Sequence, residues 1–156
     1  MPWAMVIGLV SDTHGLMRPE LFAALGGAEL ILHAGDVGDG VLSQLRAIGP
    51  VQAVYGNTDP PGQPGLVARL DLDINGHTIH VSHGHEVGSP TPEKLLARYT
   101  ADVIVFGHTH KPLIEWSGKR LVVNPGAAGP RRFKLQPSVA LMTVTDAHVE
   151  VEIRWL

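Results

Sequence analysis

Residues 4–15, AMVIGLVSDTHG, join a short apolar run to a polar loop that ends in glycine. The run lacks a clean alternation of polar and apolar side chains, which is typical of a strand buried on both faces. The same succession recurs at residues 29–36 (ELILHAGD), 51–59 (VQAVYGNTD) and 102–110 (DVIVFGHTH). Proline and glycine bound two predicted helices between the first three strands, over residues 19–25 and 40–48. Repeated strand, loop and helix indicate parallel strands in an α/β fold.

The rest of the chain is predicted mostly as β-structure. Alternating side chains over residues 66–74 predict one strand, which ends at the hairpin dipeptide Asn75-Gly76. A helix is expected over residues 92–99, with Thr91 as its N-cap. Further strands are expected at residues 77–82, 113–116, 121–124, 139–145 and 148–155. Because no repeat or linker divides the sequence, we expect a single domain over residues 1–156, with two mixed sheets packed together and helices outside.

The composition excludes several classes of protein. The 156 residues contain no cysteine, which rules out disulfides, thiolate metal sites and cysteine nucleophiles. Twelve basic and 15 acidic residues give a net charge of −3, without the basic surface that nucleic-acid binding requires. No apolar run approaches the ~20 residues that span a bilayer, and the first residues do not resemble a signal peptide. We therefore predict a cytoplasmic protein that binds neither membrane nor nucleic acid.

Polar side chains with metal-binding capacity follow five of the predicted strands. Ligands in open α/β sheets gather beyond the carboxyl ends of the strands, so these loops should converge. Carboxylate, amide and imidazole groups without sulfur favour Mn²⁺, Fe²⁺, Zn²⁺ or Co²⁺. Seven ligands exceed what one catalytic ion needs and suit two ions that share a carboxylate. The seven are Asp12, His14, Asp36, Asn57, His83, His108 and His110.

The spacing within two of these loops suggests how they bind a metal. Asp12-x-His14 and His108-x-His110 each hold two candidate ligands two residues apart. In extended backbone, side chains at positions i and i+2 point to the same side. We therefore expect each pair to reach one common centre.

The order of these motifs resembles the calcineurin-like metallophosphoesterases, and more closely their small bacterial and archaeal phosphodiesterase branch. The similarity covers nearly the whole chain, including Asn124-Pro125-Gly126 and the following Arg131. It implies a four-layer α/β/β/α sandwich and two divalent metal ions per chain. Manganese is usual in this branch, with iron, zinc, nickel or cobalt as alternatives. It also implies a phosphodiesterase that hydrolyses small phosphate esters, through a hydroxide that bridges the two metals.

The resemblance also assigns the ligands. One ion would take Asp12, His14, Asp36 and His110, and the other would take Asp36, Asn57, His83 and His108. Asp36 bridges the two and so belongs to the catalytic machinery. Many family members carry histidine after the asparagine of Gly-Asn, where it protonates the leaving group. Thr58 stands there in this sequence, and a hydroxyl is a poor general acid at pH 7.

The remaining polar candidates have weaker signals. His85 either contacts substrate or replaces the missing proton donor, and Asn57, Thr58 and Arg131 are assigned to substrate binding. Arg131 and Arg132 are equally consistent with a solvated basic pair beside a turn. His33 either orients a ligand or belongs to the core. We expect no role for three histidines of alternating strands, which should lie at the surface or half-buried: His77, His80 and His148.

Two functions of different classes remain. The first is a metal-dependent phosphoesterase, with phosphodiesters expected as substrates because the general acid is missing. The alternative is a protein-interaction scaffold on the same fold, since this branch includes a retromer subunit with an impaired metal site. All seven ligand positions are filled here, which favours the enzyme. The last β-strands offer an edge at which copies of the chain can pair as a homo-oligomer.

Overall fold

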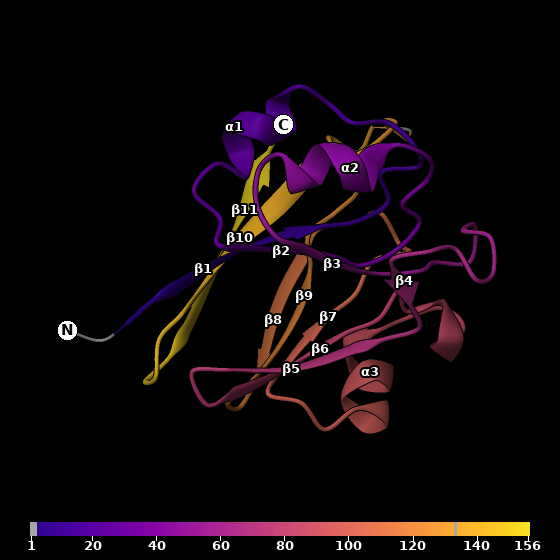
Figure 1. The fold of residues 1–156 in the computed structure, drawn as a ribbon. Helices are drawn as coiled ribbons and strands as arrows, with labels where there is room; N and C mark the ends of the chain where they lie inside the picture. The colour runs from indigo at the N-terminus through magenta and orange to yellow at the C-terminus, as the bar shows by residue number, and fades with distance from the viewer. Residues whose placement is uncertain (1–2, 133) are drawn as a thin grey trace.

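The computed structural model describes residues 3–132 and 134–156 as two β-sheets packed face to face (Figure 1). The first sheet has the strand order β11-β10-β1-β2-β3-β4, and the second β5-β6-β7-β9-β8. The first contains β1 (Met5–Val10), β2 (Leu30–His33), β3 (Val51–Val54), β4 (Leu66–Val67), β10 (Ser138–Val144) and β11 (Val149–Trp155). The second contains β5 (Leu70–Ile74), β6 (His77–Val81), β7 (Val103–Val105), β8 (Leu113–Ser117) and β9 (Arg120–Asn124). Both sheets mix parallel and antiparallel pairs.

The molecule has four layers of secondary structure, and an apolar cluster lies between each pair of adjacent layers. The largest lies between the sheets and includes Ile7, Leu32 and Val105, each fully buried. A second lies between the first sheet and two helices, α1 (Glu20–Ala24) and α2 (Val41–Arg46). The third joins the second sheet to α3 (Pro92–Arg98). Figure 1 shows α1 and α2 on one side of the paired sheets and α3 on the other, as the predicted α/β/β/α sandwich requires.

Several local predictions from the sequence are confirmed. Thr91 caps α3, because its hydroxyl accepts a hydrogen bond from the Lys94 amide. Asn75 and Gly76 form the tight turn between β5 and β6 with φ of +51° and +84°. No helix in the described residues combines the length and apolar character that a bilayer crossing needs.

The prediction of one strand over residues 66–74 is wrong. The structure divides this segment into β4, which pairs with β3 in the first sheet, and β5, which pairs with β6 in the second. Ala68 and Arg69 carry the chain from one sheet to the other. Alternation of side chains reports which face of a strand is buried, but it does not report which sheet the strand joins.

The prediction that His80 lies at the surface or half-buried is also wrong, because its side chain is buried. The same prediction is confirmed for His148, whose side chain is exposed. His80 lies opposite Asp71 in the β5–β6 pair. Its ring stacks on Tyr99, which follows α3, with 3.7 Å between the ring centroids. The side chain of His80, which the sequence predicted to lie at the surface or half-buried, is therefore covered by Tyr99 at the end of α3.

The topology places the polar loops at one edge of the sandwich. Strands β1, β2 and β3 run parallel, and so do β6, β7 and β9. The loops after β1, β2 and β3 therefore leave one edge of the first sheet, and those after β6 and β7 leave one edge of the second. Contacts between the two sets, such as His83 Nδ1 with the Ala34 carbonyl at 2.8 Å, bring these edges together.

Candidate metal centre

The loops of the centre turn sharply, with left-handed backbone at several candidate ligands. Five non-glycine residues there have φ between +46° and +71°: Asp12, His14, Asp36, His108 and His110. Such conformations cost about 1–3 kcal/mol each and persist only where the surroundings enforce them. The expectation of extended backbone is therefore wrong for both pairs. His108 and His110 also face different donor groups, whereas Asp12 and His14 share one.

Two glycines allow the loops to approach one another. A Cβ on Gly56 would lie 2.1 Å from Asp36 Oδ1, and a Cβ on Gly107 would lie 2.0 Å from Ser11 Oγ. A side chain at Gly56 would also meet the Asp36 backbone nitrogen at 2.5 Å, and one at Gly107 would displace the side chains of Ser11 and Asp12. Glycine at these strand ends thus permits the close contact between loops from neighbouring strands.

The first donor group consists of Asp12, His14 and His110. One nitrogen or oxygen of each lies within 4.8 Å of the others. Asp12 Oδ1 is 3.9 Å from His14 Nε2 and 3.4 Å from His110 Nε2. Asp12 Oδ2 accepts hydrogen bonds from the Ser11 hydroxyl and the His108 amide, which leaves Oδ1 directed toward the two imidazoles.

The second donor group consists of Asp36, His83 and His108, within the same 4.8 Å limit. His83 Nε2 lies 3.2 Å from Asp36 Oδ2 and 3.3 Å from His108 Nδ1. His108 Nδ1 is also 3.1 Å from Asn57 Oδ1, so the amide of Asn57 joins this group. The Nδ1 of His83 donates to the Ala34 carbonyl, which fixes the ring with Nε2 facing the other donors.

Asp36 lies between the two groups. Its Oδ2 is 3.7 Å from His14 Nε2 and 3.2 Å from His83 Nε2, one imidazole from each group. Its Oδ1 accepts the backbone amide of Thr58 at 2.9 Å. Burial raises the pKa of Asp36, but hydrogen bonds from His83 and Thr58 outweigh it and hold the pKa well below its usual range. The carboxylate is therefore ionised and available to either group.

The electrostatics of the other donors follow from their burial and charges. Burial raises the pKa of Asp12, but its interactions with His110 and His83 prevail and lower it. Burial lowers the pKa of His83, yet the hydrogen bond to Asp36 and the charge of Asp12 raise it overall. Burial and the neighbouring His83 lower the pKa of His108. The centre holds anionic carboxylates among imidazoles, and a cation bound there would displace the proton of His83.

Three polar residues outside the seven candidate ligands hold the loops of the centre in place, and for His33 the sequence left a ligand-orienting role and a core position open. Asp59, buried, accepts the amides of Val37 and Gly56 at 3.0 and 2.8 Å, and so joins the loops after β2 and β3. The amide of Asn124 donates to the Gly107 carbonyl and the Thr109 hydroxyl. The third, His33, connects the loops after β1 and β2. The sequence signal for Asp59 was its position two residues after Asn57.

His33 is fully buried and contacts the loops after β1 and β2 through hydrogen bonds. Its Nδ1 accepts the Gly35 amide at 3.1 Å, and its Nε2 lies 2.9 Å from Thr13 Oγ1. The Thr13 hydroxyl donates to the Val37 carbonyl, so it accepts from His33 Nε2. These contacts fix the neutral tautomer with hydrogen on Nε2. Burial lowers the pKa of His33 to about 4.

The other predicted site residues lie at different places around the centre. The His85 ring centroid is 5.4 Å from that of His83 and 6.4 Å from that of His108, beside the second group. Thr58 is exposed and contacts Asp36 through its backbone. Arg131 is exposed in the segment between β9 and β10, and no hydrogen bond or ion pair among the described residues joins it to the donors. That segment still approaches the loop after β1, because Arg18 donates to the Gly129 carbonyl.

The unsatisfied atoms test whether a cation fits here. Within residues 3–132 and 134–156, four buried side-chain atoms lack a hydrogen-bond partner, and all four belong to this centre or its border: Asp12 Oδ1, His14 Nε2, His85 Nδ1 and His110 Nδ1. Buried polar atoms are normally paired, so such a concentration points to a missing binding partner. Carboxylate and imidazole donors match divalent transition metals. The donor set therefore fits metal ions.

Comparison with known proteins also supports metal binding. A family model described as the calcineurin-like phosphoesterase superfamily domain matches residues 5–147. The chain belongs to this family. Its members use divalent metal ions, in agreement with the two donor groups.

Individual members of the calcineurin-like family are similar over most of their length. A probable metallophosphoesterase of Methanothermobacter thermautotrophicus is 34% identical, over 96% of this chain and 91% of that protein. Phosphodiesterase YfcE of Escherichia coli is 43% identical, over 79% of each. Among solved structures, Vps29 of Entamoeba histolytica complexed with Zn²⁺ has a TM-score of 0.76 and 25% identity, over 97% of this chain and 99% of that one. The family and its fold are thus established, and two of these relatives are named as phosphoesterases.

Proposed function

We propose that this chain is a phosphodiesterase that uses two divalent metal ions. The observation that carries the proposal is the pair of donor groups with Asp36 between them, in which Asp12 Oδ1 and His14 Nε2 are buried without a hydrogen-bond partner. One ion needs fewer protein ligands than the seven that converge here, and it must keep a coordination position open for substrate. Two adjacent ions that share a carboxylate account for the whole set.

The proposed ligands follow from the contacts within each group. Asp12, His14, Asp36 and His110 would hold one cation. Asp36, Asn57, His83 and His108 would hold the other. Asp36 would serve both, because its Oδ2 is near one imidazole of each group. When bound, the two cations supply a water of lowered pKa as the nucleophile and neutralise charge on the phosphate oxygens.

The chain's own residues would then manage substrate and proton. His85 is the proposed proton donor to the leaving group, because its ring borders the second donor group and its side chain is 32% exposed. Asn57 and Thr58 would contact the phosphate from the loop after β3, and Arg131 would approach it from the segment between β9 and β10. Thr58 cannot protonate an alkoxide near neutral pH, so esters with good leaving groups should be preferred. Manganese is the proposed metal and small phosphodiesters are the proposed substrates.

The alternative is the protein-interaction scaffold that the resemblance already suggested, and vacuolar protein sorting 29 (Vps29) shares this fold. A Vps29 is described in complex with Zn²⁺, so the presence of metal-binding donors does not by itself separate an enzyme from such a scaffold. Turnover does separate them. The identity to two relatives named as phosphoesterases favours the enzyme.

The test is a hydrolysis screen on purified, metal-depleted protein. Bis-p-nitrophenyl phosphate, p-nitrophenyl phosphate and cyclic nucleotides are each incubated with Mn²⁺, Fe²⁺, Zn²⁺, Ni²⁺ or Co²⁺. We expect metal-dependent release of nitrophenol, faster from the diester, and about two bound ions per chain by elemental analysis. A matched His77→Asn variant, altered at a half-buried histidine outside the donor groups, should behave as wild type. The absence of turnover with every metal would refute the enzyme and leave the scaffold.

A further inference from the structure

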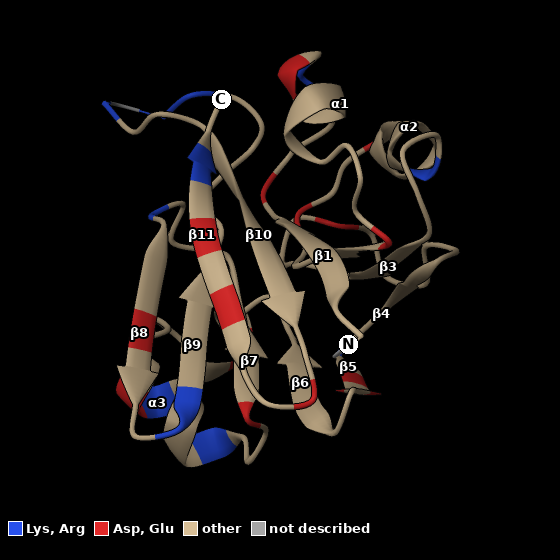
Figure 2. Cartoon of the chain, turned by 90° about the vertical axis from the view of Figure 1, so that its left-hand side faces the viewer, with Lys and Arg blue, Asp and Glu red and all other residues tan. Residues whose placement is uncertain are grey.

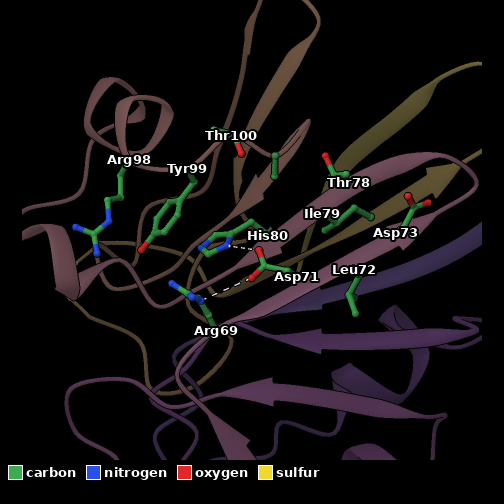
Figure 3. Close-up of a pocket in the computed structure, with 11 residues that line it drawn as sticks. Arg69, Asp71, Leu72, Asp73, Thr78, Ile79, His80, Arg98, Tyr99 and Thr100 are labelled. Atoms are coloured by element: carbon green, nitrogen blue, oxygen red, sulfur yellow. Dashed lines mark hydrogen bonds and ion pairs between the residues drawn. The ribbon is translucent and has the colours of Figure 1, made fainter.

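A hollow beside His85 leads away from the candidate metal centre. Its walls come from the end of β3, the segment between β4 and β5, the loop after β6, and the end of α3. The side chains that matter for recognition are Tyr55, Arg69, His85, Glu86, Arg98 and Tyr99. Arg69, Arg98 and Tyr99 also line a second hollow, which extends along β5 and β6 (Figure 3). A group attached to a phosphate near His83 and His85 would therefore extend between the two arginines.

The hollow has an excess of positive charge. Its carboxylate, Glu86, accepts the Gly84 amide at 2.9 Å and the Tyr99 hydroxyl at 2.7 Å, so it is engaged within its own loop. Burial raises the pKa of Glu86, but these hydrogen bonds lower it overall, and it remains an anion. Within the described residues, the one ion pair of Arg69 is a long contact with Asp71, 3.7 Å between two side chains that are each about two-thirds exposed. Such exposed pairs contribute little, which leaves Arg69 available to another anion.

Arg98 is the less engaged of the two arginines. The ion pairs of arginine in the described residues involve Arg18, Arg69 and Arg154, and none involves Arg98. Its Cζ lies 5.8 Å from the centre of the Tyr99 ring, which favours a fixed direction for the guanidinium. In Figure 3 the guanidinium groups of Arg98 and Arg69 lie on the same side as the Tyr99 hydroxyl, one from α3 and one from the segment just before β5.

The floor beneath these arginines is rigid. The Tyr99 ring stacks on the buried His80 ring at 3.7 Å. His80 Nδ1 is 2.9 Å from Asp71 Oδ1, and its Nε2 is 2.9 Å from Ser82 Oγ. Ser82 directly precedes His83 of the candidate metal centre, so the hydrogen bonds of His80 end at the residue next to the centre. A rigid surface that orients two guanidinium groups reduces the entropy lost when an anion binds.

We propose that Arg69 and Arg98 bind a second anionic group of the substrate, located on the leaving alcohol. This rests on the proposed function, because it assumes that a phosphodiester is cleaved beside His85. The substrate class is then a phosphodiester whose departing alcohol carries a phosphate, phosphonate or carboxylate. Guanidinium groups recognise the oxygens of such anions by charge-assisted hydrogen bonds. The two arginines act as specificity residues, and neither contacts the metal donors.

Three methyl aryl phosphodiesters test this substrate class. Their leaving phenols are 4-hydroxyphenylphosphonate, 4-hydroxybenzoate and 4-hydroxybenzamide, of which the last is a neutral control. We expect wild type to favour the anionic esters over the neutral one by at least about 10-fold in kcat/KM, mainly through KM. Arg98→Gln and Arg69→Gln should lose this preference while they keep the rate on the neutral ester, and Arg98→Lys should retain part of it. The two anionic arms distinguish phosphonate from carboxylate recognition.

Binding of the free phenols to metal-depleted protein, by titration calorimetry, gives a readout independent of turnover. Arg154→Gln, in β11 at the edge of the first sheet (Figure 2), is the matched control and should bind as wild type does. The proposal is overturned if the anionic and neutral probes bind and react alike, or if the preference survives both glutamine variants. If no ester is hydrolysed but the anionic phenols bind in an arginine-dependent way, the phosphodiesterase assignment fails and the anion site stands. Thermal unfolding verifies that each variant is folded.

Discussion

Replacement of His33 should remove a measurable part of the protein's sensitivity to acid. The ring is fully buried, and its Nδ1 accepts the Gly35 amide, so protonation would place two N–H donors against each other. Burial accordingly lowers the pKa of His33 from 6.5 to about 4. In the unfolded chain the same imidazole is solvated and takes up its proton near the ordinary value.

The magnitude follows from this difference in pKa. The fall from 6.5 to about 4 corresponds to about 3 kcal/mol, at about 1.4 kcal/mol per unit of pKa. Between these values the unfolded state binds the proton and the folded state does not. The contribution of neutral His33 to stability is therefore fully present above about pH 6.5 and is lost as the pH falls toward 4.

Urea unfolding of metal-depleted wild type and His33→Asn, measured between about pH 4.5 and 7.5, gives the comparison. Asparagine offers an oxygen to the Gly35 amide but does not titrate. The variant should be less stable than wild type near pH 7, because it loses the packed ring. Its free energy of unfolding should also fall less steeply with acid, and the two curves should converge. His148→Asn, at an exposed histidine, controls for removal of a titrating group, and parallel curves for wild type and His33→Asn would refute the reasoning.

Three further predictions concern the candidate metal centre. Gly56→Ala should reduce the bound Mn²⁺, measured by elemental analysis, because the new Cβ would lie 2.1 Å from Asp36 Oδ1; two ions per chain in this variant would contradict that contact. Asp36→Ala should abolish turnover and disturb both ions, whereas His14→Ala should weaken mainly one, as calorimetric titration with Mn²⁺ would reveal. Thr58→His should raise kcat/KM about 10-fold on phosphodiesters with poor leaving groups, and His85→Ala should lower it on the same esters. Equal dependence on leaving-group pKa in wild type and both variants would exclude a role for either residue in proton transfer.

The local signals of the sequence were sufficient for most of the secondary structure. Apolar runs that end in glycine-bounded polar loops predicted β1, β2, β3 and β7, and Asn75-Gly76 predicted the turn between β5 and β6. These features depend on short-range preferences of the backbone and on burial of each strand, which a few neighbouring residues determine. The single domain over residues 1–156 stays a prediction.

The composition of the candidate centre was also readable, because its residues share one position, the carboxyl end of a strand. The motif order pointed to the family that the comparison established. The roles of the seven candidate ligands remain proposals. The sequence did not indicate the left-handed backbone at Asp12 or His108, because that conformation is enforced by contacts between loops.

Tertiary structure alone decided which distant segments meet. The alternation over residues 66–74 could not reveal that the chain leaves one sheet and enters the other at Ala68 and Arg69. The sequence could not reveal that Tyr99 covers His80. Nor could it reveal that His33 and Asp59 form hydrogen bonds that join neighbouring loops. The sequence by itself determined most of the strands, the order of the polar loops that follow them and the chemistry of the donors. The pairing of sheets, the burial of polar groups and the grouping of the donors come from contacts between residues far apart in the chain, whose formation depends on the packing of the whole core.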